Sequence, residues 1–150
     1  MRILLLTAFL FCMLPGLKAQ HSKKMENNKQ DVAAITGMLE DYYFKGIYEG
    51  NLDLLNQVYY TGTLLFGDVK GQPYAKTLDD YLDGVKNRQS PKDSGKPFKG
   101  EVISVEVVNT IAIARVTLKM YDFNYCEYLS FHKLDGRWLI VNKMISDLSQ

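Results

Sequence analysis

Two side chains of this sequence, Glu127 and His132, have the chemistry of a general acid or base and stand inside a predicted strand, Phe123–Lys133. A carboxyl group that is buried among aromatic rings has its pKa raised by desolvation, so that it can carry a proton or donate a hydrogen bond. Glu127 is a candidate of this kind if its side of the strand faces the interior. His132 takes the role if the other side does.

The strand is followed by Asp135-Gly136 and by a second predicted strand, Arg137–Ser146. An Asp-Gly step between two runs rich in Tyr, Phe, Ile and Val is a strong signal for a β-hairpin. If the loop consists of these two residues, Glu127 faces Met144. Glu127 then shares its side of the hairpin with Tyr125, Leu129, Phe131, Trp138 and Ile140.

A three-residue loop that begins at Leu134 is the alternative, with the glycine in a bulge. The pairing then slips by one residue, Glu127 faces Lys143, and the two form a cross-strand ion pair with a structural role. His132 shares the opposite side with Trp138 in this register. The sequence leaves both registers open, and with them the side to which Glu127 points.

Ten tyrosines in 150 residues are a second feature that points to a site. A buried Tyr needs a partner for its hydroxyl, so several that converge on one cavity give it apolar walls with a few polar points. The candidate ligand-binding residues are Tyr43 and Tyr59 on predicted helices and Tyr125 and Trp138 on the hairpin. They predict a small apolar or aromatic ligand; alternatively, the rings only fill the core.

The elements that would position these residues are three helices followed by a sheet. Asp31 can cap the first helix, which ends near Gly50, Asn51 caps a short second one, and a Thr77-x-x-Asp80 capping box opens the third. A small β element lies at residues 63–75, a loop at 89–99, and a four-stranded antiparallel meander follows. This order predicts an α+β domain in which three N-terminal helices cover one face of a curved, cone-like sheet, leaving a cavity between them.

The chain begins like a secretory signal peptide. Arg2 precedes an apolar run at residues 3–14, Pro15-Gly16 interrupts it, and Ala19 offers a cleavage point. The run is too short for a membrane span of about 20 residues, although an uncleaved anchor is the alternative. We therefore expect a signal peptide at 1–19, a flexible leader at 20–30, one domain at 31–148, and a secreted or periplasmic protein.

Charge and composition exclude several classes of function. Without residues 1–19 the chain has 16 basic and 17 acidic residues, which argues against nucleic acid as the partner. One histidine lies in the predicted leader and Cys126 is the only cysteine outside the signal peptide, so no metal site is predicted. No Gly-rich phosphate loop precedes a helix, and no cofactor is predicted.

Two stretches carry a resemblance to a known family. The run Tyr43–Leu55 resembles the first two helices of nuclear transport factor 2-like proteins, and more narrowly the bacterial branch labelled putative lumazine-binding. The run Glu127–Lys143, with its Asp-Gly-x-Trp-x-Ile pattern, resembles the closing hairpin of that branch, where an acid often stands at the place of Glu127. The resemblance extends in outline over residues 31–148.

The resemblance implies a cone-shaped α+β barrel with a pocket at its wide end, often dimeric through the outer face of the sheet. Members of the superfamily include steroid isomerases, scytalone dehydratase, polyketide cyclases and many domains without a known activity. Fold alone does not select among them.

Three functions therefore stay open. The first is an exported domain that binds a small molecule non-covalently, without catalysis or with an unknown activity. The second is an isomerase, dehydratase or cyclase that uses Glu127 or His132 as general acid or base. The third is a dimeric interaction module with a solid interior. An unpaired carboxyl in a cavity would favour the enzyme, and a Glu127–Lys143 pair beside a Tyr-lined cavity would favour the binder.

Overall fold

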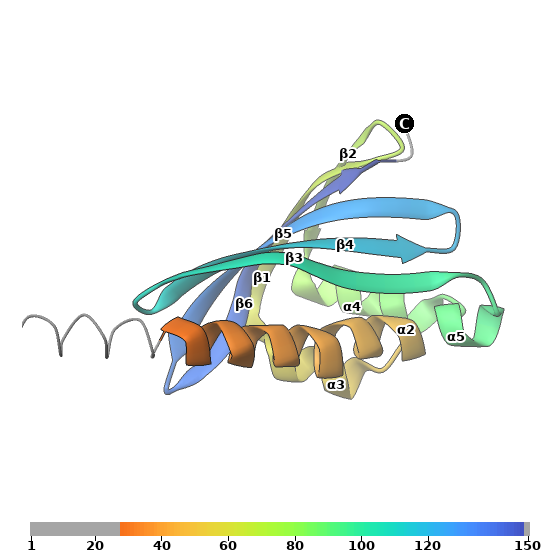
Figure 1. Ribbon diagram of the computed structural model, residues 1–150. Helices are drawn as coiled ribbons and strands as arrows, with labels where there is room; N and C mark the ends of the chain where they lie inside the picture. The colour runs from red at the N-terminus through yellow and green to blue at the C-terminus, as the bar shows by residue number, and fades with distance from the viewer. Residues whose placement is uncertain (1–27, 149–150) are drawn as a thin grey trace, which may run out of the picture.

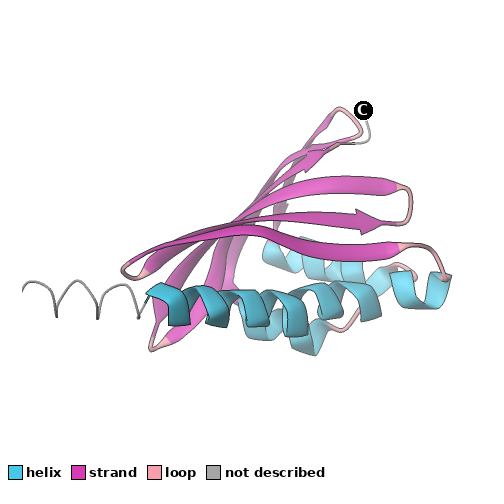
Figure 2. Cartoon of the chain, viewed as in Figure 1, coloured by secondary structure: helices cyan, strands magenta, loops and turns pink. Residues whose placement is uncertain are grey.

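The computed structural model describes residues 28–148. The predicted signal peptide at 1–19 and residues 20–27 of the predicted leader lie outside the described residues. One strongly curved sheet carries all the helices on a single side, and its two edges do not meet (Figures 1 and 2). The predicted α+β fold class is confirmed.

The first helix runs beneath the sheet as one continuous element (Figure 1). Residues 28–38 are α-helical, the segment η1 (Leu39–Phe44) is π-helical, and α2 (Lys45–Glu49) returns to α-helix. Gly50 ends it in the left-handed conformation, with φ 66°. The expected Asp31 cap is wrong, since the chain is helical three residues earlier.

The other helices begin where side chains can accept hydrogen bonds from their first N–H groups. Asn51 accepts from Asp53 and Leu54 at the start of α3 (Leu52–Val58), as predicted. The predicted Thr77–Asp80 capping box opens α4 (Leu78–Asn87). A short helix, α5 (Pro91–Ser94), stands in the segment predicted as a loop, because Ser90 caps it and a proline is tolerated in its first turn.

Six strands form the sheet, in the order β2-β1-β6-β5-β4-β3. Their bounds are β1 Tyr59–Val69, β2 Gln72–Thr77, β3 Phe98–Val108, β4 Ile111–Met120, β5 Phe123–Leu134 and β6 Arg137–Asp147. The last four form the predicted antiparallel meander. The small β element predicted between the helices is longer than expected and joins the same sheet, because β1 pairs with β6 in parallel.

The β5–β6 hairpin combines a two-residue loop with a bulge. Leu134 faces Arg137 and Phe131 faces Ile140, as the two-residue loop requires, but Ser130 faces Asn142, which leaves Val141 as an extra residue. Beyond the bulge Leu129 faces Lys143 and Glu127 faces Ile145. The two-residue register therefore holds only near the loop, where Glu127 is not reached, and the slipped register of a three-residue loop is wrong throughout.

The bulge decides which side chains of β6 face the helices. Trp138 and Ile140 are buried before it, and Lys143 and Ile145 are buried after it. Side chains alternate with a period of two along a strand, so one extra residue moves every later side chain to the opposite face. Without the bulge, Asn142 and Met144 would face the interior in place of Lys143 and Ile145.

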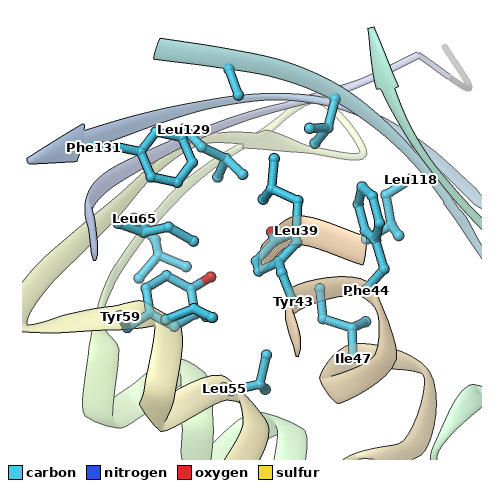
Figure 3. Packing of buried hydrophobic residues seen from close by; sticks show 14 of the residues in the cluster. Leu39, Tyr43, Phe44, Ile47, Leu55, Tyr59, Leu65, Leu118, Leu129 and Phe131 are labelled. Carbon is cyan, nitrogen blue, oxygen red and sulfur yellow. The ribbon is translucent and has the colours of Figure 1, made fainter. Parts of the chain in front are cut away.

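The core lies between the first helix and the concave face of the sheet. Figure 3 shows it as a cluster of aliphatic and aromatic side chains, among them Leu39, Tyr43 and Phe44 from η1 and Leu118 and Leu129 from the sheet. The first helix packs closely on β3 at Gly100, where an added Cβ would lie 2.4 Å from the ring of Phe44. Only a glycine fits at this point of β3.

Candidate functional site

A carboxylate, an ammonium and a phenol meet in the interior. Lys143 Nζ lies 2.7 Å from Glu127 Oε1, and it donates a hydrogen bond of 2.7 Å to the hydroxyl of Tyr43. That hydroxyl donates in turn to Glu127 Oε2 at 2.6 Å. All three residues are at most 1 % exposed. We call Glu127, Lys143 and Tyr43 the buried triad.

Three different local features bring the triad together. The alternation along β5 places Glu127 on the concave face with Tyr125 and Leu129. The bulge in β6 turns Lys143 to the same face, diagonally across from Glu127. Tyr43 comes from the π-helical segment η1, a kind of irregularity that is frequent at functional sites.

Burial and charge in the triad keep Tyr43 as a neutral phenol and Lys143 as a charged ammonium. Burial, and next the negative charge of Glu127, raise the pKa of Tyr43 well above its usual value, so its hydroxyl stays neutral and can donate. Burial acts to lower the pKa of Lys143, but its interactions with Glu127, Tyr81 and Tyr74 together outweigh it and the pKa is raised. Lys143 is therefore an ammonium and not a free amine nucleophile.

One carboxylate oxygen of Glu127, Oε1, can still accept a hydrogen bond. Lys143 holds Oε1 in an ion pair at 2.7 Å, and Oε1 has no hydrogen-bond partner within residues 28–148. Glu127 also lines a cavity. Its carboxylate can therefore accept a hydrogen bond from a molecule bound there.

The cavity has a volume of about 200 Å³ and lies between α4, β2 and the ends of β4–β6 nearest to them. Its walls are the apolar side chains of Ile47, Val69, Leu118, Met120 and Ile145 and the rings of Tyr74, Tyr81 and Tyr125. A cavity of about 150 Å³ suffices to hold benzene. The volume therefore fits one substituted aromatic ring.

Positive charge predominates around this cavity. Lys76, Arg88 and Lys143 line it together with a single acid, Glu127, which is already paired with Lys143. The Nε and Nη2 atoms of Arg88 are buried without a hydrogen-bond partner in the described part of the chain. The site therefore offers unused donors at Arg88 and an unused acceptor at Glu127.

The predicted site residues fall in four places. Glu127 and Tyr125 line the cavity, while Tyr43 and Tyr59 lie behind it in the core, with ring centroids 6.1 Å apart (Figure 3). Trp138 lies elsewhere, where its Nε1 donates to Asp31 at 3.0 Å.

His132 lines a groove on the convex face of the sheet, together with Ile111 and Ile113. It stands five residues after Glu127 on the same strand, so the two side chains point to opposite faces. The structure does not bring the two candidate proton carriers together.

Sequence reasoning missed Arg88, Tyr74 and Tyr81 as lining residues. Tyr81 is a buried residue of α4, and a tyrosine within a helical pattern predicts burial without indicating a role. Arg88 follows α4 directly and carries no sequence signal, because its importance depends on the elements folded over it. No group of three or more His, Cys, Asp or Glu within residues 28–148 could hold a metal ion.

Comparisons with known proteins agree with this fold. A family model described as putative lumazine-binding matches residues 30–146. The structure is similar to a nuclear transport factor 2-like protein of unknown function from Silicibacter pomeroyi, with a TM-score of 0.71, 19 % identity, and coverage of 79 % of this chain and 97 % of that one. A protein of the same description from Shewanella baltica has a TM-score of 0.68 and 21 % identity, with 79 % and 94 % covered.

A third similar structure, from Methylobacillus flagellatus, has a TM-score of 0.69 and 23 % identity and covers 79 % of this chain and 92 % of its own. It too is described as a nuclear transport factor 2-like protein of unknown function. These likenesses show the fold. A search of curated proteins finds no match, and none of the described helices is long and apolar enough to cross a membrane.

Proposed function

Given that this chain belongs to the family described as putative lumazine-binding, with the nuclear transport factor 2-like fold, we propose that it binds a small aromatic molecule non-covalently. The binding site is the cavity beside the buried triad. The observation that carries the proposal is a cavity of about 200 Å³ walled by tyrosine rings and aliphatic side chains, with unused polar atoms at two points.

The pairing of Glu127 supports binding over catalysis. A general base must reach its substrate with a carboxylate free to take a proton. Here Lys143 and the hydroxyl of Tyr43 both hold the carboxylate, at 2.7 and 2.6 Å. Taking up a proton would break the ion pair inside the protein, which is strongly unfavourable.

Ligand titration followed by two-dimensional NMR tests the proposal. We expect single-ring aromatic compounds, or lumazine as the family description suggests, to shift the signals of Tyr81, Leu118 and Met120. Gly84→Leu should abolish the shifts, because Gly84 lines the cavity from α4 and a leucine there would fill it. Gly37→Leu is the matched control, since a Cβ added at this helical glycine would meet nothing within 4 Å.

Unchanged binding by Gly84→Leu, or no shift with any compound of the panel, would refute the proposed site. Proton transfer is the second candidate function, because Glu127 lines the cavity and its Oε1 has no hydrogen-bond partner in the described part of the chain. It predicts turnover of enolisable ketones that Glu127→Gln abolishes.

We also propose that the protein forms a homodimer through the convex face of the sheet. Val108, Ile111 and Ile113 are exposed there side by side on β3 and β4. Soluble monomers seldom expose large contiguous apolar patches. The face also carries Glu106 and Arg115, which a two-fold symmetric partner could pair. Light scattering should give twice the chain mass, and Ile113→Lys should give the monomer, whereas Tyr42→Lys on the first helix should not.

Export is the last part of the proposal. It rests on the signal-peptide features of residues 1–19. Mass spectrometry of the protein from its native host should find an N-terminus at Gln20, and an intact Met1 or an N-terminus far from residue 20 would contradict it.

A further inference from the structure

The position of Arg88 identifies a chemical class of ligand, on the premise that the cavity binds a small molecule. We infer that this ligand is an aromatic carboxylate, whose acid group pairs with the Nε–Nη2 edge of the Arg88 guanidinium. The ring of the ligand then lies among the aromatic and aliphatic side chains of the cavity. The inference deepens the proposed function and can fail separately from it.

The first support is the state of the guanidinium. Arg88 follows α4 at the helix end, and its side chain enters the cavity wall. Nε and Nη2 are buried without a hydrogen-bond partner among the described residues. Buried donors of a charged group are costly when unpaired, and nearly all such groups in proteins have partners. A partner from outside the chain resolves the imbalance.

The second support is shape. Nε and Nη2 lie on the same edge of the planar guanidinium, and their N–H bonds run parallel. This spacing matches the two oxygens of a carboxylate, which arginine binds with two parallel hydrogen bonds. A neutral carbonyl or hydroxyl would occupy one donor and leave the other unpaired.

The third support is the charge around the cavity. Of the three cations there, Lys143 is neutralised by Glu127 at 2.7 Å, and Lys76 is exposed with its ammonium 5.6 Å from the ring centre of Tyr74. Arg88 is half-buried, and its buried Nε and Nη2 atoms have no hydrogen-bond partner within residues 28–148. One negative charge on the ligand balances the positive charge of Arg88.

The neighbours of Arg88 suit an acid as well. Its positive charge acts on the hydroxyls of Tyr74 and Tyr125, both of which line the cavity. Burial raises the pKa of both phenols, so they remain neutral donors around neutral pH. At the far side, Glu127 repels a second negative charge, which favours a monocarboxylate whose ring points toward the triad.

The test compares acids with uncharged molecules of the same shape. Benzoate, phenylacetate and 4-hydroxybenzoate are titrated by calorimetry and NMR against the corresponding amides, at low salt. We expect the acids to bind at least tenfold more tightly than the amides. Arg88→Gln should remove this preference, while Arg88→Lys, which keeps the charge without the two-donor edge, should keep part of it. Arg137→Gln, beside the hairpin loop and outside both the cavity and the convex face, is the matched control and should bind as the unaltered protein does.

A second readout does not depend on the ligand. Because the guanidinium has unpaired buried donors, Arg88→Met should raise the melting temperature of the ligand-free protein while it abolishes the preference for acids. Equal affinities for acids and amides, with signals that Gly84→Leu abolishes, would refute the acid class and leave the binding site intact. If neither set binds, both the inference and the proposed function fail.

Discussion

Two lysines of the β5–β6 hairpin, Lys133 and Lys143, each pair with a carboxylate, and the surroundings of the two pairs separate a structural role from a functional one. Near the loop, Lys133 Nζ lies 2.6 Å from Asp31 Oδ1, which also accepts from Trp138 Nε1 at 3.0 Å. At the other end, Lys143 pairs with Glu127 at 2.7 Å, and Tyr43 donates to the same carboxylate at 2.6 Å. Each site thus has a carboxylate, a lysine and an aromatic hydrogen-bond donor.

The two pairs differ in exposure and in what lies beside them. The side chains of Lys133 and Asp31 are 32 % and 16 % exposed, against 2 % and 1 % for Lys143 and Glu127. The first pair attaches the first helix to the hairpin. The second pair borders a cavity. Its mutual attraction offsets the cost of burying the two charges only while both the lysine and the carboxylate are present. The comparison teaches that a buried pair beside a cavity is the place to look for function.

The largest expected effect separates the two lysines. Lys143→Met leaves the Glu127 carboxylate buried and unpaired, which should lower the free energy of unfolding by about 3–5 kcal/mol. Lys133→Met removes a half-exposed partner and should cost about 1 kcal/mol or less. Urea denaturation at neutral pH measures both.

The control for the larger effect is a double variant. Glu127→Gln combined with Lys143→Met leaves no charge buried, so it should regain part of the stability lost by Lys143→Met alone. Equal losses for the two lysine variants would break the comparison, because they would mean that burial does not distinguish the pairs.

The next effect concerns the aromatic member of the buried triad. Tyr43→Phe removes the hydroxyl that joins Lys143 and Glu127 and should cost about 1–3 kcal/mol, the range for a buried group that loses its hydrogen-bond partner. Tyr128→Phe makes the same change on the exposed convex face and should alter stability by about 0.5 kcal/mol or less. A loss of stability at Tyr43 no greater than at Tyr128 would show that the Lys143–Glu127 ion pair does not depend on the Tyr43 hydroxyl.

The fold was predictable because its signals are local. The capping box of α4, the Asn51 cap of α3 and the Asp135-Gly136 loop each depend on a few neighbouring residues, and the structure contains all three. The parallel pairing of β1 with β6 was not predictable in this way, since the two strands are far apart in the sequence and nothing in either one specifies the partner.

The site was predictable only in part, for a related reason. Glu127 could be singled out by its type and place, but the residue that pairs with it depends on the bulge at Val141. The bulge contains no Gly or Pro and does not interrupt the apolar residues of β6. The side of the sheet to which its side chains point therefore changes without a signal in the sequence. Arg88 was missed because an arginine that follows a helix is usually exposed. Only the folded chain shows that this one lines a cavity.

The pH dependence of the free energy of unfolding should differ between the two sites. At alkaline pH, the change in stability should come from the buried triad. The pKa values of Lys143 and Tyr43 are both raised in the folded state. A raised pKa contributes stability that is complete below the unfolded value of about 10 and is lost as the pH rises toward the folded value. We therefore expect the free energy of unfolding to fall above about pH 10, by up to about 1.4 kcal/mol per pH unit for each proton.

Tyr43→Phe checks the assignment, because it removes one of the titrating groups and should make this alkaline decline less steep. Other buried tyrosines, such as Tyr59, titrate in the same direction and should leave part of the decline in place. An identical slope in the variant would exclude Tyr43 as a contributor.

The acid side should report the half-exposed pair, with the smallest effect of the series. Burial acts to raise the pKa of Asp31, but the hydrogen bonds from Lys133 and Trp138 outweigh it and the pKa is lowered. A lowered pKa contributes stability that is present above the unfolded value of about 3.9 and is lost as the pH falls through the folded value. Asp31→Asn should therefore be less stable than the unaltered protein at neutral pH by about 1 kcal/mol or less, and the difference should shrink below about pH 4. A difference that persists in acid would mean that Asp31 holds the helix to the hairpin by hydrogen-bond geometry alone, without a contribution from its charge.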